Sequence, residues 1–285
     1  MRENRDPTEW PGGYLTSSWT ARREGACAVL VFDRPPLGTI SHRDVEDLER
    51  ELLGLADGGC RAVILTGTGS TFIRHADLDD LAAMASGTST SGDPNAWIRV
   101  LRLLDRGPFV SVAAINGQAW GGGLEIALTC NFRVMDSQAT LAFPEVALGI
   151  IPGVAAHRAI GLLPEGRALD LMLTGRVLSA SDARDWGLAT RIAPHGSTLE
   201  TALSLCDEFL RYPAGAVAAV RDLVVGARDV SQRDQRRAQS EAWTRLAADP
   251  QVGVLVDAAR VRYANGGDSA NALALTQPNA TTEGE

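Results

Sequence analysis

An apolar run of six residues, Val110–Ile115, precedes three consecutive glycines at positions 121–123 and a helix-forming segment at 124–128. The β-branched residues of the run, and the Asn116-Gly117 pair that closes it, indicate a buried strand. Three glycines before a helix let another molecule approach the backbone without meeting a Cβ atom. The first turn of such a helix also carries unpaired N–H groups at the positive end of the helix dipole. The segment therefore predicts a site for an anion, or for an oxygen that becomes an anion during a reaction.

Two glutamates flank this predicted site. Glu125 lies in the first turn of the helix, and Glu145 follows it by 20 residues within an apolar segment, 143–149. A carboxylate among apolar side chains is costly unless it has a partner. Each acid alone has an ordinary explanation, because Glu125 would complement the helix dipole and Glu145 would be a solvated loop charge. Together they favour an acid/base pair, in which mutual repulsion would raise the pKa of one member.

Several short motifs around these glutamates occur in a fixed order. The positions concerned are Asn116, Gly117, Ala119, Gly121, Gly122, Gly123, Glu125, Ile126, Ala127, Cys130, Arg133, Pro144, Glu145, Leu148, Gly149, Pro152 and Gly153. This pattern resembles the crotonase superfamily, which contains the enoyl-CoA hydratases and isomerases. Both glutamates stand in the register that hydratases of the superfamily use. A later segment, 174–188, is similar to the one that follows the active site throughout the superfamily.

Strand-like and helix-like segments alternate along the chain as far as Ile192, and only helix-like segments follow. This alternation predicts an α/β fold with a mostly parallel sheet. The resemblance implies a more specific architecture, a crotonase-like ββα spiral core with a helical C-terminal segment. We expect a flexible N-terminal extension at residues 1–16, the spiral core at 17–195, the helical segment at 196–263 and a disordered tail at 264–285.

The resemblance also implies a reaction, the addition of water across the 2,3 double bond of an enoyl-CoA thioester. In such a site Glu145 would protonate C2, and Glu125 would orient and activate the water that attacks C3. The backbone N–H groups of Ala76 and Gly122 would form the oxyanion hole. Coenzyme A would arrive as part of the substrate, and no metal or separate cofactor is expected. The other positions expected to contact substrate are His75, Asp77, Leu78, Gly121 and Pro144.

Residues 73–75 depart from the superfamily's pattern, in which two small residues and a glycine precede Ala76. Ile73, Arg74 and His75 stand there instead. A histidine restricts the backbone more than a glycine does, so it bears on the direction of the next N–H. His75 is open to three interpretations: a functional side chain, a wall of the pocket or an exposed loop residue. We hypothesise that this loop selects a bulkier or functionalised acyl chain.

Composition narrows the classes of function. The net charge of −8 and the pI near 5.1 argue against binding to nucleic acid or to an anionic membrane. All 27 basic residues are arginines, which excludes a lysine Schiff base and a Walker lysine. The four cysteines are scattered without metal-like spacing, the N-terminus lacks the apolar core of a signal peptide, and no apolar stretch reaches membrane-spanning length. We therefore expect a reduced cytoplasmic protein without structural zinc.

Alternatives to a hydratase remain open. An isomerase of the superfamily needs one well-placed base and usually keeps only the counterpart of Glu145, and thioester or C–C hydrolases also use this scaffold. A dinucleotide-binding oxidoreductase would need glycines spaced as G-x-G-x-x-G, which residues 117–123 do not provide. A non-catalytic RNA-binding homologue is opposed by the acidic charge and the retained glutamates. Members of the superfamily assemble into oligomers, so we also expect this chain to form a homotrimer or hexamer.

Overall fold

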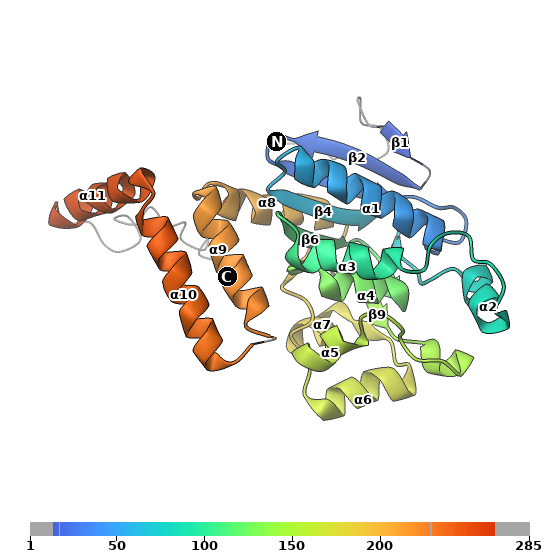
Figure 1. Cartoon of the computed structure of the whole chain (residues 1–285). Coiled ribbons are helices and arrows are strands. Elements are labelled where there is room, and N and C mark those ends of the chain that lie inside the picture. Colours follow the sequence, from blue (N-terminus) through green and yellow to red (C-terminus); the bar gives the residue numbers. More distant parts are fainter. Residues whose placement is uncertain (1–13, 17, 229, 266–285) are drawn as a thin grey trace, which may run out of the picture. The chain divides into compact units, whose positions relative to one another are not determined.

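The computed structural model describes residues 14–16, 18–228 and 230–265, and seven strands of these residues form the larger of two β-sheets (Figure 1). Its strands, in chain order, are β1 (Tyr14–Thr16), β2 (Trp19–Glu24), β3 (Cys27–Phe32), β4 (Ala62–Gly67), β6 (Val110–Ile115), β8 (Phe132–Asp136) and β11 (Arg191–Ala193). They lie in the order β1-β2-β3-β4-β6-β8-β11. The first three pair antiparallel, and from β3 onward all neighbours pair parallel.

Four short strands form the second sheet of the described residues, in the order β10-β9-β7-β5. They are β5 (Thr71–Ile73), β7 (Gln118–Trp120), β9 (Thr140–Ala142) and β10 (Leu178–Ser179). Along the chain β4 is followed by β5, β6 by β7 and β8 by β9, so that each long strand continues into a short one. This repeat is the one expected of a ββα spiral, and the predicted α/β class with a parallel sheet is confirmed.

Helices separate these strand pairs. Those that precede residue 211 are α1 (His42–Asp57), α2 (Leu78–Ser86), α3 (Ala96–Arg106), α4 (Gly122–Thr129), the 3₁₀ helix η1 (Glu145–Leu148), α5 (Ala156–Leu162), α6 (Glu165–Thr174), α7 (Ala180–Asp185) and α8 (Thr198–Leu210). Helices α1, α2 and α7 begin at a side chain that caps them. Ser41 caps α1 and forms a capping box with Asp44.

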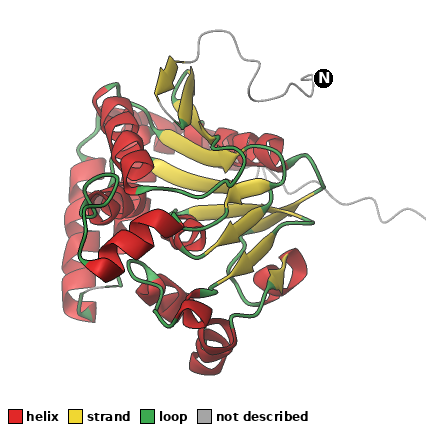
Figure 2. Ribbon diagram, turned by 90° about the vertical axis from the view of Figure 1, so that its right-hand side faces the viewer, coloured by secondary structure: helices red, strands yellow, loops and turns green. Residues whose placement is uncertain are grey.

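Strands β3, β4 and β6 are buried on both faces, because helices lie on either side of them (Figure 2). In β3 the side chains of Ala28, Leu30 and Phe32 join a core shared with α1, α3 and α4. Val29 and Val31 point the opposite way and join a second core shared with α8. This alternation follows from the period of two along a strand, and burial on both faces explains the continuous apolar runs that mark these strands in the sequence.

Helix α8 lies in the same compact unit as the large sheet. The expected spiral core ends at residue 195, whereas the chain divides into compact units between Leu210 and Arg211. The reason is that α8 buries Ala202, Leu205 and Cys206 against the large sheet. The second unit contains α9 (Ala214–Gly226), α10 (Gln232–Ala247) and α11 (Pro250–Ala264), in which α10 packs against both of the others.

The predicted flexible segments lie at the two ends of the chain. Residues 14–16 form β1 on the edge of the large sheet, so this part of the expected N-terminal extension is a strand rather than a loose segment. Residues 1–13 and 17, and nearly all of the expected tail at 264–285, lie outside the described residues. Among the helices that the structure describes, none has the length and apolar character that crossing a membrane requires.

Candidate active site

Helix α4 begins where its glycines meet the backbone of neighbouring strands. A Cβ atom on Gly123 would lie 2.0 Å from the carbonyl oxygen of Ile73 in β5, far inside contact distance. Gly121 has a φ of +48°, which L side chains rarely adopt, and its N–H donates to the carbonyl of Ala142 in β9 (2.9 Å). The start of α4 can therefore pack against β5 and β9 only because these residues are glycines.

The segment after β5 brings a second backbone N–H to this helix start. Ile40 and Ala76 form a parallel bridge, in which the Ile40 N–H donates to His75 (2.9 Å) and the Ile40 carbonyl accepts the N–H of Asp77 (2.8 Å). In such a bridge the N–H of the middle residue, Ala76, points away from its partner. A Cβ atom on Gly122 would lie 3.3 Å from the Ala76 nitrogen. Within the described chain, neither of these two N–H groups has a hydrogen-bond acceptor.

Glu125 enters the site from the first turn of α4, and only 3% of it is exposed. Its Oε1 accepts hydrogen bonds from the N–H groups of Val154 (2.8 Å) and Ala155 (2.5 Å), which precede α5. These two donors fix the orientation of the carboxyl group. Burial raises the pKa of Glu125, and the N–H donors lower it without cancelling the effect of burial.

Glu145 is the first residue of η1 and is 8% exposed. Its Oε1 lies 2.8 Å from the position that a Cβ atom on Gly121 would take, so the carboxyl group lies at the glycine-lined start of α4. Its Oε2 is buried and has no hydrogen-bond partner among the described residues. Buried polar atoms are almost always paired, so such an oxygen suggests a place for a ligand. The pKa of Glu145 is raised to about 7, chiefly by burial and further by the charge of Glu125.

His75 lies beside the same glycines. Its Cβ is 3.2 Å from the position of a Cβ on Gly121, and its Nδ1 contacts the carbonyl oxygen of Ala76. Since a carbonyl oxygen can only accept, this contact requires the proton on Nδ1. The side chain is half-buried, which rules out the interpretation as an exposed loop residue. Ile73 is fully buried within β5 and belongs to the core rather than to the loop. A contact between His75 and substrate stays a prediction.

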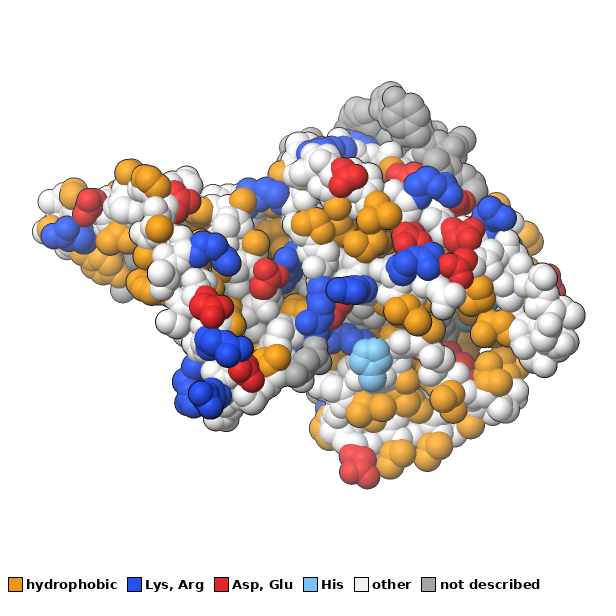
Figure 3. Space-filling view, viewed as in Figure 1, with side chains coloured by type: hydrophobic (Ala, Val, Ile, Leu, Met, Phe, Trp, Pro, Cys, Tyr) orange, Lys and Arg blue, Asp and Glu red, His pale blue; other side chains and the backbone are white. Residues whose placement is uncertain are grey.

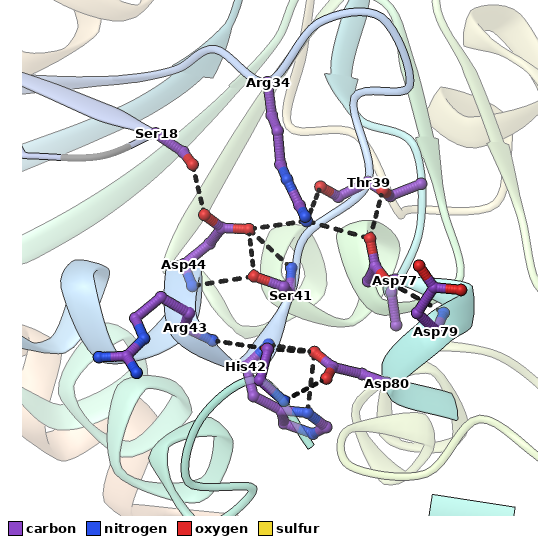
Figure 4. A network of polar contacts seen from close by, with 12 residues as sticks. Ser18, Arg34, Thr39, Ser41, His42, Arg43, Asp44, Asp77, Asp79 and Asp80 are labelled. Carbon is purple, nitrogen blue, oxygen red and sulfur yellow. Dashed lines mark hydrogen bonds and ion pairs between the residues drawn. The ribbon is translucent and has the colours of Figure 1, made fainter. Parts of the chain in front are cut away.

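Asp77 has partners within the chain (Figure 4), and its contact with substrate stays a prediction. Its carboxylate accepts hydrogen bonds from Arg34, from Thr39 and from the N–H of Asp79. Through the bond from Asp79, the side chain of Asp77 caps α2. The other two predicted contacts are open to a ligand to different degrees. Leu78 is exposed at the start of α2, and Pro144 is half-buried immediately before Glu145.

Sequence reasoning missed the partners that orient the predicted site residues. The Val154 and Ala155 N–H groups belong to the backbone, which every residue except proline carries in the same form, so the residue types do not predict these donors. Arg34, which contacts Asp77, precedes a proline after β3, and this Arg-Pro pair is the only local signal of its role.

The sequence model of one protein family matches residues 22–255, most of the length of this chain. The chain belongs to the enoyl-CoA hydratase/isomerase family. A proposed enoyl-CoA hydratase of Thermus thermophilus is 34% identical over 217 residues, which are 74% of this chain and 82% of the relative. The carnitinyl-CoA dehydratase of Salmonella arizonae is 31% identical over 227 residues, 78% of this chain and 86% of that enzyme.

Solved structures of the enoyl-CoA hydratase/isomerase family share the fold. A proposed enoyl-CoA hydratase of Thermobifida fusca, solved in complex with CoA, is similar with a TM-score of 0.71 and 28% identity, covering 81% of this chain and 93% of that one. The predicted crotonase-like fold is therefore confirmed, and the interpretation as a dinucleotide-binding oxidoreductase is wrong. Among the described residues, no group of three or more His, Cys, Asp and Glu side chains is arranged to hold a metal ion.

The raised pKa of Glu145 makes stability depend on pH in a defined direction. Its folded pKa of about 7 exceeds the value of 4.5 expected when unfolded, so its favourable contribution is complete below about pH 4.5 and is lost as the pH rises through 7. Glu145→Gln removes this loss. We expect the variant to gain on the order of 1–3 kcal/mol relative to wild type between pH 5 and pH 8, measured by urea unfolding.

Glu165→Gln is the matched control, since Glu165 is an exposed glutamate in the first turn of α6. Its stability difference from wild type should stay constant over the same pH range. A constant difference for Glu145→Gln as well would show that the Glu145 carboxyl titrates normally.

Proposed function

We propose that this protein is an enoyl-CoA hydratase, which adds water across the 2,3 double bond of an enoyl-CoA thioester. The observation that carries the proposal is the pair of buried glutamates, Glu125 and Glu145, at a helix start with an unpaired N–H. Hydration needs a sink for charge on the thioester oxygen, a held water and a proton for C2. Each of these needs has a candidate group in the site.

The N–H groups of Ala76 and Gly122 are the proposed oxyanion hole, which stabilises the negative charge on the thioester oxygen. As water attacks C3, the electron pair of the double bond moves toward the thioester oxygen, which becomes an enolate oxygen. Two backbone donors that have no other acceptor among the described residues, from elements held by close packing, suit this developing charge. Removal of one such donor costs roughly 10²–10³ in rate where it has been measured.

The two carboxyl groups supply the proton transfers. A Glu145 with a pKa of about 7 is protonated in about half of the molecules at neutral pH, and the protonated form can give its proton to C2. Glu125, with one oxygen fixed by two N–H donors, holds the water and accepts its proton as the oxygen bonds to C3. A proton then returns from Glu125 to Glu145 through the next water, so the net change is the addition of one water.

The relatives support a CoA thioester as the substrate class. The solved structure of the Thermobifida fusca relative contains CoA, and the Salmonella arizonae relative is named a dehydratase, whose reaction is the reverse of a hydration. Because a catalyst accelerates both directions, we propose that this protein interconverts 2-enoyl and 3-hydroxyacyl thioesters. In this proposal CoA is part of the substrate, and no separate cofactor takes part.

An isomerase or a hydrolase of the same family is the alternative. An isomerase moves one proton and needs one base, whereas this site buries two carboxyl groups whose charges affect one another. Burying the second carboxyl group costs free energy without serving an isomerase, and this favours the hydratase.

Self-association into a trimer or hexamer is a further part of the proposal. The helices of the second unit expose large apolar side chains, namely Val220, Val224, Trp243, Val254, Leu255, Val256, Val261 and Tyr263. In the first unit, hydrophobic side chains gather on the surface over α5 and α6 (Figure 3). Apolar surface of this extent commonly marks contacts between subunits.

Light scattering at micromolar concentration should therefore give a molar mass several times that of the 30.2 kDa chain. A stable mass equal to one chain would remove this part of the proposal and leave the catalytic part intact.

Glu125→Gln and Glu145→Gln test the two-carboxylate mechanism. Each amide keeps the size of the side chain and removes the proton transfer, so we expect acyl-CoA binding to persist while hydration falls by on the order of 10²–10⁴. Both variants should be assayed with 2-enoyl-CoA and 3-enoyl-CoA thioesters of several chain lengths. Glu165→Gln again serves as the control and should keep wild-type turnover.

An isomerase would tolerate Glu125→Gln far better than Glu145→Gln, and its wild type would convert 3-enoyl rather than hydrate 2-enoyl thioesters. Hydration at the wild-type rate in both variants would exclude the mechanism.

A further inference from the structure

Arg34 gathers three acceptors that come from different parts of the chain (Figure 4). Its Nη1 lies 2.9 Å from Oδ2 of Asp44, 3.1 Å from Oδ2 of Asp77 and 3.1 Å from the carbonyl oxygen of Thr39. Asp44 belongs to the first turn of α1, and Asp77 caps α2. One guanidinium group therefore ties together the loop after β3, the start of α1 and the start of α2.

The carboxylate of Asp77 is held at both oxygens. Oδ2 accepts hydrogen bonds from Arg34 and from the hydroxyl of Thr39 (3.0 Å), and Oδ1 accepts the N–H of Asp79 (3.0 Å). The side chain of Asp77 is only 12% exposed, and that of Asp44 only 5%. A carboxylate buried to this degree is fixed in place by its partners rather than mobile in solvent.

This cluster holds the segment that carries the proposed thioester-oxygen donor. Residues 38–40 and 74–77 run alongside each other, with hydrogen bonds from Arg74 to Gly38, from Ile40 to His75 and from Asp77 to Ile40. Ala76 lies in the middle of this pairing and offers its N–H to the opposite side. The side chains of Arg34 and Thr39 reinforce this pairing, because both donate hydrogen bonds to the carboxylate of Asp77, the residue that follows Ala76.

We propose that Arg34 and Asp77 are positioning residues, which aim the Ala76 N–H at the thioester oxygen by fixing residues 38–40 against residues 74–77. Neither side chain is proposed to touch the substrate. The inference rests on the proposed hydration chemistry, and it assigns to Asp77 a role different from the substrate contact that its sequence position suggests.

A positioning role and a purely structural role predict different effects of the same substitution on turnover. The Arg34 side chain is 36% exposed, but its partners Asp77 and Asp44 are 12% and 5% exposed, so removal of the guanidinium group also costs stability. Hydrogen-bond stabilisation of a transition state falls steeply with small displacements of the donor. Loss of the Arg34–Asp77 contact should therefore lower the turnover of the folded protein in addition to its effect on stability.

Asp77→Asn and Arg34→Gln are the test variants. Asparagine is as good a helix cap as aspartate, so Asp77→Asn keeps the start of α2 while losing the ion pair. Arg191→Gln is the matched control, because the Arg191 side chain is 38% exposed and bonds Glu208 at 2.8 Å between β11 and α8. We expect both test variants to lose at least about tenfold in kcat with KM little changed, and the control to retain wild-type kcat.

A spectroscopic measurement reports on the N–H donors directly. A conjugated aryl enoyl thioester absorbs at longer wavelength when its carbonyl oxygen accepts stronger hydrogen bonds, so its shift on binding, recorded before hydration proceeds, reports on the donors separately from turnover. The shift should be smaller in Asp77→Asn and Arg34→Gln than in wild type and unchanged in Arg191→Gln. Arg34→Lys, which restores a single positive donor, should recover part of both the shift and kcat.

Wild-type kcat and wild-type band shift in both test variants would overturn the inference. A fall in unfolding temperature alone, with the shift preserved, would also overturn it, since the cluster would then be structural only. Failure of the proposed function is distinguishable, because in that case the wild-type protein itself would not hydrate enoyl-CoA thioesters.

Discussion

The start of α4 packs against the backbone of β5 at a distance that no side chain permits. A Cβ on Gly123 would overlap the carbonyl of Ile73, and a Cβ on Gly122 would lie 3.3 Å from the nitrogen of Ala76. Two N–H groups from segments far apart in the sequence thereby reach the same place. The same helix start carries Glu125 in its first turn and lies against the carboxyl group of Glu145. The proposed chemistry depends on this one close backbone contact.

Burial of two carboxyl groups opposes stability and suits catalysis. Both groups would be better solvated in an unfolded chain, and burial accordingly raises the pKa of each. The surroundings differ, however. Glu125 is held by two backbone donors, whereas Oε2 of Glu145 has none among the described residues. This difference supports the proposed roles, because the bonded carboxylate is suited to hold a water and the group with a pKa of about 7 is suited to give a proton.

The sequence predicted those elements whose stability is local or whose burial is complete. Val110–Ile115 is apolar apart from Ser111 because helices cover both faces of its sheet. Short strands such as β5 and β7 have three residues each and are stabilised by pairing with one another. A strand this short shows no clear hydrophobic periodicity, so the sequence does not predict it. Helix α8 belongs to the first unit because of its packing against the sheet, which its own residues do not reveal. Glu125 and Glu145 were predictable as residues, but the donors that orient Glu125 and the cluster that holds Asp77 became visible only in three dimensions.

The central claim is that the Ala76 and Gly122 N–H groups bind the thioester oxygen while Glu125 and Glu145 share one water beside it. A crystal structure with a saturated acyl-CoA, which cannot be hydrated, tests this claim most directly. The account predicts a thioester oxygen about 2.7–3.1 Å from both nitrogens, with C2 and C3 facing the two carboxyl groups. A thioester oxygen bound elsewhere, or an acyl chain whose C2 and C3 lie beyond the reach of both glutamates, would contradict it.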